Sequence, residues 1–303
     1  MGVAGRAKLG RGRPGSPLSG QGGQQSRGNG NGHVQGDVQI TGMSQWFNSR
    51  SGPYQAVRDV SLTLEAGQFV ALVGPSGCGK STLLNAIAGL QRPTIGDVRI
   101  DGHPVDGVDR SVGYLFQRDA LLPWRTVLGN VMLPLSYRQV PPKEARERAR
   151  AWLARVQLGK FENHYPHQLS GGMKKRVALA SVFVYGPRVL LMDEPFSALD
   201  VQTRNLMEEE LLELWTESRP TVLFVTHDLE EAIGMADRVV MMTASPGRIK
   251  SDYVIDLPRP RALTEIRFED SFQSYYERLW QDLRDEVAEA YEADTRDAHS
   301  AAQ

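Results

Sequence analysis

One eight-residue run constrains what this chain can fold into more than any other feature. Gly74-Pro-Ser-Gly-Cys-Gly79-Lys80-Ser81 matches the pattern G-x-x-x-x-G-K-[ST]. It follows a continuous apolar run, Phe69–Val73, which predicts a buried strand, and it precedes a helical pattern over Lys80–Leu90. A strand, a glycine-rich loop and a helix in this order are typical of α/β proteins with mainly parallel sheets. We therefore expect a parallel sheet covered by helices.

The chemistry of this loop suits a phosphate group. Its three glycines allow the backbone to curl so that successive N–H groups point at phosphate oxygens, and the following helix adds the positive end of its dipole. Lys80 is expected to reach the β- and γ-phosphates of a nucleotide, and the Ser81 hydroxyl is expected to bind Mg²⁺. The Cys78 thiol is expected to lie near the nucleotide, where a bulky adduct would block binding. Nucleotide contacts are expected from Gly74, Pro75, Ser76, Gly77, Cys78, Gly79, Lys80, Ser81 and Thr82.

A second apolar run ends in two acidic residues. Val189–Met192 predicts a buried strand, and Asp193 and Glu194 follow it directly. Open α/β sheets bind ligands beyond the carboxyl ends of their strands, so both carboxylates are expected beside the loop. Asp193 is placed to hold Mg²⁺, and Glu194 is placed to take a proton from an attacking water. Kinases, GTPases and helicases share these features, although the Asn-Lys-x-Asp motif of GTPases is absent.

Hydrophobic patterning extends the α/β prediction along the chain. Short apolar runs at Thr221–Val225 and Arg238–Met242 predict further buried strands of a mostly parallel sheet. Alternating runs at Val38–Ile40, Val60–Leu64 and Asp97–Ile100 predict antiparallel strands. Helical patterns occupy Lys143–Val156, Ser170–Tyr185, Val201–Ser218 and Leu229–Ala236.

The two ends of the chain differ in composition from its centre. Residues 1–36 contain five Lys or Arg residues, no acidic residue and almost nothing to bury, so we expect a disordered, dispensable Gly/Arg-rich arm. The segment after Pro258 is acidic and predicts one long helix whose apolar stripe packs on the core. That stripe consists of Phe268, Phe272, Tyr275, Tyr276, Leu279, Trp280 and Leu283.

Overall composition excludes several classes of protein. The formal net charge of −1 argues against a dedicated nucleic-acid binder. A single cysteine excludes an internal disulfide. No run of about 18 apolar residues occurs, so a role in a membrane process would require docking onto another polypeptide.

Several short motifs, in a fixed order, resemble one family. Leu169-Ser-Gly-Gly-Met173 resembles the signature of ABC-type ATPases, which is usually Leu-Ser-Gly-Gly-Gln, and it opens a predicted helix. Gln117 in Leu-Phe-Gln is similar to the family's Q-loop glutamine. Ser197-Ala-Leu-Asp200 is similar to its D-loop, and His227 in Val-Thr-His-Asp to its switch histidine.

This resemblance implies a fold and its boundaries. We expect an α/β P-loop ATPase core with a mostly parallel sheet, an antiparallel β subdomain and a helical signature subdomain. The ATPase domain would span residues 37–260, with the helical subdomain at about 118–185. The arm at 1–36 and a C-terminal helical extension at 261–303 would flank it.

The resemblance also implies ATP and Mg²⁺ as cofactors and assigns roles to residues. Catalysis is expected from Glu194, His227 and Gln117, and Mg²⁺ binding from Ser81, Gln117 and Asp193. An aromatic ring ahead of the phosphate loop should stack on adenine. Phe47 fits that position best, and Trp46 and Tyr54 are alternatives.

The signature implies a dimer. In the family, the helix N-terminus at the signature faces the γ-phosphate held by a partner subunit, so two chains complete each site. Replacement of the usual glutamine by Met173 removes a polar amide but leaves the backbone donors. The remaining nucleotide contacts are expected from Ser170, Gly171, Gly172, Met173 and Asp200.

The same resemblance points to transport. Met173, Leu121-Leu-Pro-Trp124 and Leu257-Pro-Arg-Pro-Arg261 resemble the branch that imports nitrate, sulfonates, taurine and similar solutes. Expected partners are a second identical subunit, integral membrane permease subunits and, indirectly, a solute-binding protein, at the cytoplasmic face of the bacterial inner membrane; no nucleic acid is expected. The alternatives are the ATPase of an exporter or lipid transporter, a soluble non-transport ABC ATPase, and a non-catalytic binding module.

Overall fold

The computed structural model describes residues 36–49 and 52–301, with side chains described through residue 290. The expected arm at 1–36 lies outside the described residues except for Gly36, whose N–H donates to the Asp101 carboxylate. Within the described ranges, no helix is long and apolar enough to cross a membrane.

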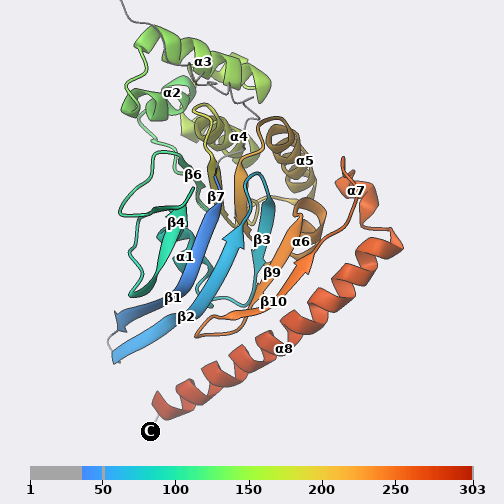
Figure 1. Cartoon of the computed structure of the whole chain (residues 1–303). Helices are drawn as coiled ribbons and strands as arrows, with labels where there is room; N and C mark the ends of the chain where they lie inside the picture. The colour runs from blue at the N-terminus through green and yellow to red at the C-terminus, as the bar shows by residue number, and fades with distance from the viewer. Residues whose placement is uncertain (1–35, 50–51, 302–303) are drawn as a thin grey trace, which may run out of the picture. The chain divides into compact units, whose positions relative to one another are not determined.

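A six-stranded sheet forms the centre of the described region (Figure 1). Its strands, in spatial order, are β10 (Ile249–Val254), β9 (Arg238–Met242), β3 (Phe69–Val73), β8 (Thr221–Val225), β7 (Val189–Asp193) and β6 (Val112–Leu115). All neighbours are parallel except β10, which pairs antiparallel with β9 at the edge. β3 and β8 are buried along their whole length, which explains their continuous apolar sequences. The predicted mostly parallel sheet is confirmed.

An antiparallel sheet accounts for the alternating runs. Its order is β2 (Gly52–Leu64), β1 (Val38–Ser49), β4 (Ile95–Ile100) and β5 (His103–Pro104). One hydrophobic cluster joins its apolar face, the helix α1 (Lys80–Ile87) and one face of the six-stranded sheet. The helix predicted up to Leu90 is shorter because Gly89 has φ 69° and approaches Gly107 so closely that a Cβ would lie 1.8 Å from the Gly107 carbonyl oxygen.

A group of helices has a core of its own. These are α2 (Val127–Tyr137), α3 (Pro142–Arg155) and α4 (Gly171–Phe183), with 3-10 turns η1 (Gly159–Phe161) and η2 (Pro166–Gln168) between α3 and α4. Their buried side chains form one separate cluster, and α4 also contributes Leu179 and Phe183 to the core beneath the sheet. Figure 1 shows this group beyond the β6 and β7 ends. The boundaries at 118 and 185 stay predictions.

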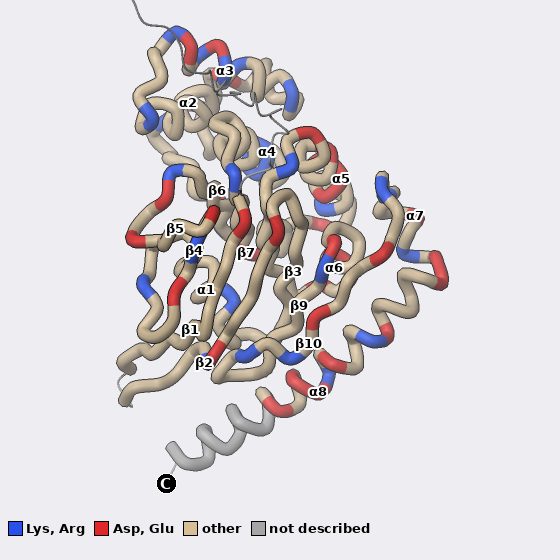
Figure 2. Tube along the Cα trace, in the orientation of Figure 1, with Lys and Arg blue, Asp and Glu red and all other residues tan. Residues whose placement is uncertain are grey.

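The remaining helices cover the other face of the six-stranded sheet. They are α5 (Val201–Ser218), α6 (Leu229–Met235), α7 (Leu263–Ile266) and α8 (Asp270–Ala301). Figure 2 shows charges of both signs on α3, α5 and α8, whereas β3 and β8 carry none. The prediction of one long C-terminal helix was wrong in detail, because a break between α7 and α8 leaves Phe268 80% exposed. Trp280 is also 48% exposed, while Phe272 and Leu279 are buried.

Two strands had no clear sequence pattern. β6 is only four residues long and contains Gly113, which gives close contact with α4: a Cβ there would lie 2.6 Å from Val182 Cγ1. β10 is an edge strand with mostly polar residues. Short strands and polar edges lack the periodicity on which such predictions depend.

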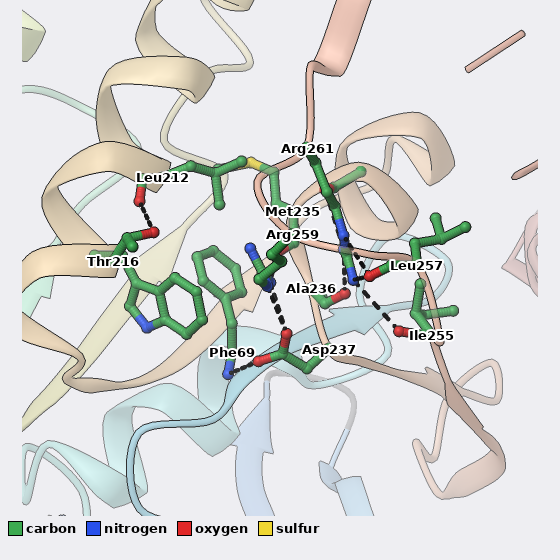
Figure 3. Close-up of polar contacts among 12 residues, drawn as sticks. Phe69, Leu212, Thr216, Met235, Ala236, Asp237, Ile255, Leu257, Arg259 and Arg261 are labelled. Atoms are coloured by element: carbon green, nitrogen blue, oxygen red, sulfur yellow. Dashed lines mark hydrogen bonds and ion pairs between the residues drawn. The ribbon is translucent and has the colours of Figure 1, made fainter. Parts of the chain in front are cut away.

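Arg261 anchors the segment that leads from β10 to α7. Its side chain is 7% exposed and its guanidinium donates to five backbone carbonyls, three of which, those of Ala236, Ile255 and Leu257, are drawn in Figure 3. Nearby, Arg259 pairs with Asp237, which in turn accepts from the Phe69 N–H at the start of β3. Burial lowers the pKa of Arg261 to about 10, so the guanidinium stays charged at neutral pH.

Replacing Arg261 by Leu should destabilise the fold. The substitution leaves buried carbonyls without donors, and such losses should lower the free energy of unfolding by roughly 2–4 kcal/mol. Chemical denaturation followed by circular dichroism would measure it. Arg99→Leu is the matched control, because the contacts of Arg99 with Asp97 and with the Gly102 carbonyl are exposed, so its loss should change stability by less than about 0.5 kcal/mol. Equal stabilities for the two variants would contradict the anchoring role.

Candidate active site

The loop from 74 to 79 is shaped by close backbone packing. Gly77 and Gly79 have φ of 78° and 95°, values that favour glycine. A Cβ on Gly79 would lie 2.5 Å from Val57 Cγ2, and one on Gly74 would lie 2.9 Å from the Met242 carbonyl oxygen. The helix α1 that follows has no side-chain cap and no acid in its first turn, so its first N–H groups are free to donate hydrogen bonds to an anion.

Lys80 is folded back onto the same loop. Its Nζ donates to the carbonyl oxygens of Gly74 and Pro75, each at 2.8 Å, and the residue is only 7% exposed. Ser76, Gly77 and Ser81 are exposed, and Thr82 is half-buried in the first turn of α1. The loop therefore presents its small residues to solvent and holds its lysine inside.

The side chain of Cys78 points into the protein core, and its proximity to a bound nucleotide stays a prediction. Its thiol is fully buried within the cluster between the two sheets, and Sγ is 3.7 Å from Lys80 Nζ. Burial raises the pKa of the Cys78 thiol, although Lys80 opposes that shift. A buried thiol with a raised pKa reacts slowly, so we expect thiol reagents to modify Cys78 slowly.

Asp193 stands beside Ser81 at the end of β7. Burial raises the pKa of the Asp193 carboxyl, while a hydrogen bond with Ser81 and the charge of Lys80 oppose the shift. A hydroxyl and a carboxylate in contact are oxygen ligands that suit Mg²⁺, which usually takes one or two protein groups plus substrate phosphates. Tyr114 on β6 also bonds Asp193, and burial raises the pKa of that phenol. No sequence motif had indicated Tyr114.

Two other predicted residues, His227 and Gln117, contact the carboxylate of Glu194. His227 Nδ1 lies 3.2 Å from Glu194 Oε2, and Gln117 Nε2 donates to the same oxygen at 3.4 Å. Glu194 has φ 44°, an uncommon conformation for a non-glycine residue and one that clusters at functional sites. Its N–H donates to the Val225 carbonyl and its carbonyl accepts from Ser197, which fix the turn. Gln117 bonds Glu194 rather than Ser81 or Asp193.

Partly buried ion pairs, which the sequence did not indicate, hold the segments that carry His227 and Gln117. Arg204 on α5 bonds Asp228 and the Leu199 carbonyl and lies near Glu231. Burial raises the pKa of Glu231 to about 7. On the other side, buried Lys175 of α4 donates to the Gln117 carbonyl and pairs with Asp119.

The signature residues begin α4. Ser170 is the N-cap, and its hydroxyl accepts from the Met173 N–H. Ser170 and Gly171 are exposed, while Gly172 packs so tightly against α5 that a Cβ would lie 2.8 Å from Thr203 Cγ2. Among the described residues no hydrogen bond joins this helix start to the phosphate loop, so the structure does not bring the two together within one chain.

Asp200 and the aromatic candidates lie outside the Glu194 centre. Asp200 is exposed and caps α5 by accepting from the Thr203 N–H at 3.0 Å, which lowers the pKa of the carboxyl. Phe47 is half-buried and stacks on Tyr54 across β1 and β2, with ring centroids 5.6 Å apart. Trp46 points to the opposite face of β1 and is 43% exposed. The choice among the three rings stays a prediction.

Comparison with known proteins places this geometry in a family. The family model described as "ABC transporter" matches residues 57–197. An uncharacterised ABC transporter ATP-binding protein of Methanocaldococcus jannaschii is 44% identical over 250 residues, which cover 82% of this chain and 92% of the relative. An aliphatic sulfonates import ATP-binding protein of Bacillus cereus is 41% identical over 233 residues, which cover 77% of this chain and 92% of the relative.

Similarity to solved structures supports the same family. The dimeric structure of a post-hydrolysis state of an ATP-binding cassette, bound to ADP and Pi, superposes with a TM-score of 0.66 and 33% identity, covering 73% of this chain and all of that chain. The predicted fold class is therefore confirmed. The chain belongs to the ATP-binding proteins of ABC transporters and is an ATPase.

Proposed function

We propose that this chain is the ATP-hydrolysing subunit of an importer that carries an aliphatic sulfonate, nitrate, taurine or a similar small solute. The similarity to the sulfonate import protein over 92% of its length supports an importer rather than an exporter or lipid transporter. It would bind permease subunits at the cytoplasmic face of the inner membrane and depend on a solute-binding protein. Trp124, 72% exposed beside α2, is the proposed contact with the permease.

The convergence of Gln117 and His227 on Glu194 Oε2 carries the proposed mechanism. The phosphate loop would bind the triphosphate of ATP through its N–H groups and Lys80. Glu194 would accept a proton from the attacking water, with Gln117 and His227 orienting its carboxylate. Mg²⁺, held through Ser81 and Asp193, would neutralise charge on the phosphates.

A second copy of this chain would complete each site. The exposed start of α4 offers the N–H groups of Gly171 and Gly172, which the Ser170 side chain does not cap, and the positive end of a helix dipole, which suit an anion. Because this helix start makes no hydrogen bond to the phosphate loop of its own chain within the part of the chain that the structure describes, it would be available to a γ-phosphate bound by the partner. Met173 is half-buried at the helix start, so its side chain leaves the backbone donors in place.

Glu194→Gln should separate hydrolysis from binding. The amide keeps the size of the side chain but cannot accept a proton, and general-base catalysis contributes about 10²–10⁴-fold, so the turnover number should fall by roughly that factor. ATP binding should persist, because Lys80 and the loop are unchanged. Phosphate release and equilibrium binding of a fluorescent ATP analogue would measure the two effects.

Lys80→Ala is the matched control for this variant. It should lose ATP binding and hydrolysis together, because the buried ammonium is removed from the loop. Size-exclusion chromatography with Mg-ATP should show a dimer for Glu194→Gln and a monomer for Lys80→Ala. Near-normal turnover by Glu194→Gln would refute the general-base assignment.

Mixing two inactive variants should test the shared site. Lys80→Ala disables the phosphate loop, and Ser170→Arg places a bulky cation at the start of α4. A mixed dimer contains one site in which an intact loop meets an intact signature, so ATPase activity should reappear on mixing although each variant alone is inactive. If the mixture stays inactive while mixed dimers form, the two-chain site is wrong.

The solute can be tested in the source cell. Deletion of the gene should abolish growth on aliphatic sulfonates, taurine or nitrate as the sole sulfur or nitrogen source, and growth on sulfate and ammonium should be unaffected. Restoration by the wild-type gene but not by Glu194→Gln would tie uptake to hydrolysis. Normal uptake of all these solutes after deletion would exclude the proposed substrate class.

A further inference from the structure

The C-terminal helix α8 reaches the phosphate loop through a single turn of the chain. This β9–β10 turn (residues 243–248) joins the edge strand β10 of the six-stranded sheet to its neighbour β9, and Figure 1 shows α8 running alongside β10. One end of the turn contacts Cys78 and the other contacts α8. Asp282 and Glu286 of α8 lie more than 200 positions from the loop in sequence, and no motif pointed to them.

The turn packs directly on the phosphate loop. A Cβ on Gly247 would lie 1.9 Å from the Cys78 carbonyl oxygen, so only glycine allows this approach. Gly247 is also fixed to β2, because its N–H donates to the Ala56 carbonyl and its carbonyl accepts from the Arg58 N–H, each at 2.9 Å. The position of the turn therefore limits where the Cys78 backbone can lie.

Glu286 of α8 holds the turn from the opposite side. Its carboxylate accepts from the Ala244 N–H at 2.8 Å and pairs with Lys250 at 2.9 Å, and the residue is only 5% exposed. A buried carboxylate bonded to a backbone N–H fixes that backbone strongly, since charged hydrogen bonds are the stronger ones. Lys250 also donates to the Asp282 carbonyl, which ties its position to α8.

Asp282, one turn earlier on α8, makes a different set of contacts. Its carboxylate accepts from the Ser251 hydroxyl and from the Tyr253 phenol. Both residues lie within β10, so these two hydrogen bonds do not hold the β9–β10 turn. Asp282 therefore fastens α8 to the strand, whereas Glu286 fastens α8 to the turn that touches the loop. The two acids offer a matched comparison on one helix.

We infer that Glu286 is a positioning residue for the phosphate loop: acting through Ala244 and Gly247, it sets the affinity of the loop for the nucleotide triphosphate. Glu286 touches neither substrate nor reacting atoms. Its loss would let the turn shift, and the Cys78 backbone, which carries one of the loop N–H groups, would shift with it. The inference rests on the proposed role of the phosphate loop in binding ATP.

Glu286→Gln should raise the KM for ATP and leave kcat almost unchanged. Loss of one charged hydrogen bond to the turn should weaken ATP binding roughly threefold to tenfold. Asp282→Asn should lower the melting temperature about as much as Glu286→Gln does, but it should leave the KM for ATP unchanged. Steady-state ATPase assays and equilibrium binding of a fluorescent ATP analogue would be run on both full-length variants.

Two further variants keep the test decisive. Glu286→Asp retains the charge but shortens the reach to Ala244, so its KM should lie between those of the wild type and Glu286→Gln. This variant serves as the test if Glu286→Gln fails to fold. Gly247→Ala should raise KM more than Glu286→Gln, since it acts directly on Cys78. An unchanged KM in folded Glu286 variants, or an equal rise in Asp282→Asn, would overturn the inference. If Lys80→Ala also binds ATP normally, the proposed function fails instead.

Discussion

The close approach of backbones around the phosphate loop is the constraint on which the rest of the site depends. Gly74 meets β9, Gly79 meets β2, and Gly247 meets Cys78, each at a distance that excludes a Cβ. The loop is thus held close to β2, to β9 and to the β9–β10 turn, and the Cys78 side chain is buried in the cluster between the two sheets. Such packing leaves its N–H groups few alternative directions, which is what a preorganised anion site requires.

Parallel strand order brings together catalytic candidates that the sequence motifs indicated separately. The loop follows β3, His227 follows β8, Glu194 follows β7 and Gln117 follows β6, and these four strands are neighbours. Parallel strands end at one edge, so four segments distant in sequence meet beyond it. Pairing of Asp193 with Val225 and of Met192 with Leu115 sets the register that lets Gln117 and His227 reach one oxygen of Glu194.

Continuous apolar runs predicted most strands of the six-stranded sheet, whereas contacts between distant parts of the chain could not be predicted from the sequence. The apolar runs correctly indicated β3, β7, β8 and β9, because strands buried on both faces need continuous apolar sequence. Tyr114, Lys175 and Arg261 were missed, since each acquires its role from a partner on a distant element. The burial of the Cys78 side chain was not predicted, because a motif fixes the backbone path but not the direction of every side chain.

Lys80 shows how stability and function are balanced in this site. Its ammonium is buried and held by two neutral carbonyls, and among the ion pairs of the described residues none includes it. A buried charge without a counter-ion is unfavourable, so the fold retains an electrostatic strain at the loop. Asp193, whose pKa burial raises, is the nearby group of opposite sign, yet it bonds Ser81 and Tyr114. An incoming triphosphate would supply the missing negative charge to Lys80, so part of the cost of burying this lysine would return as affinity for ATP.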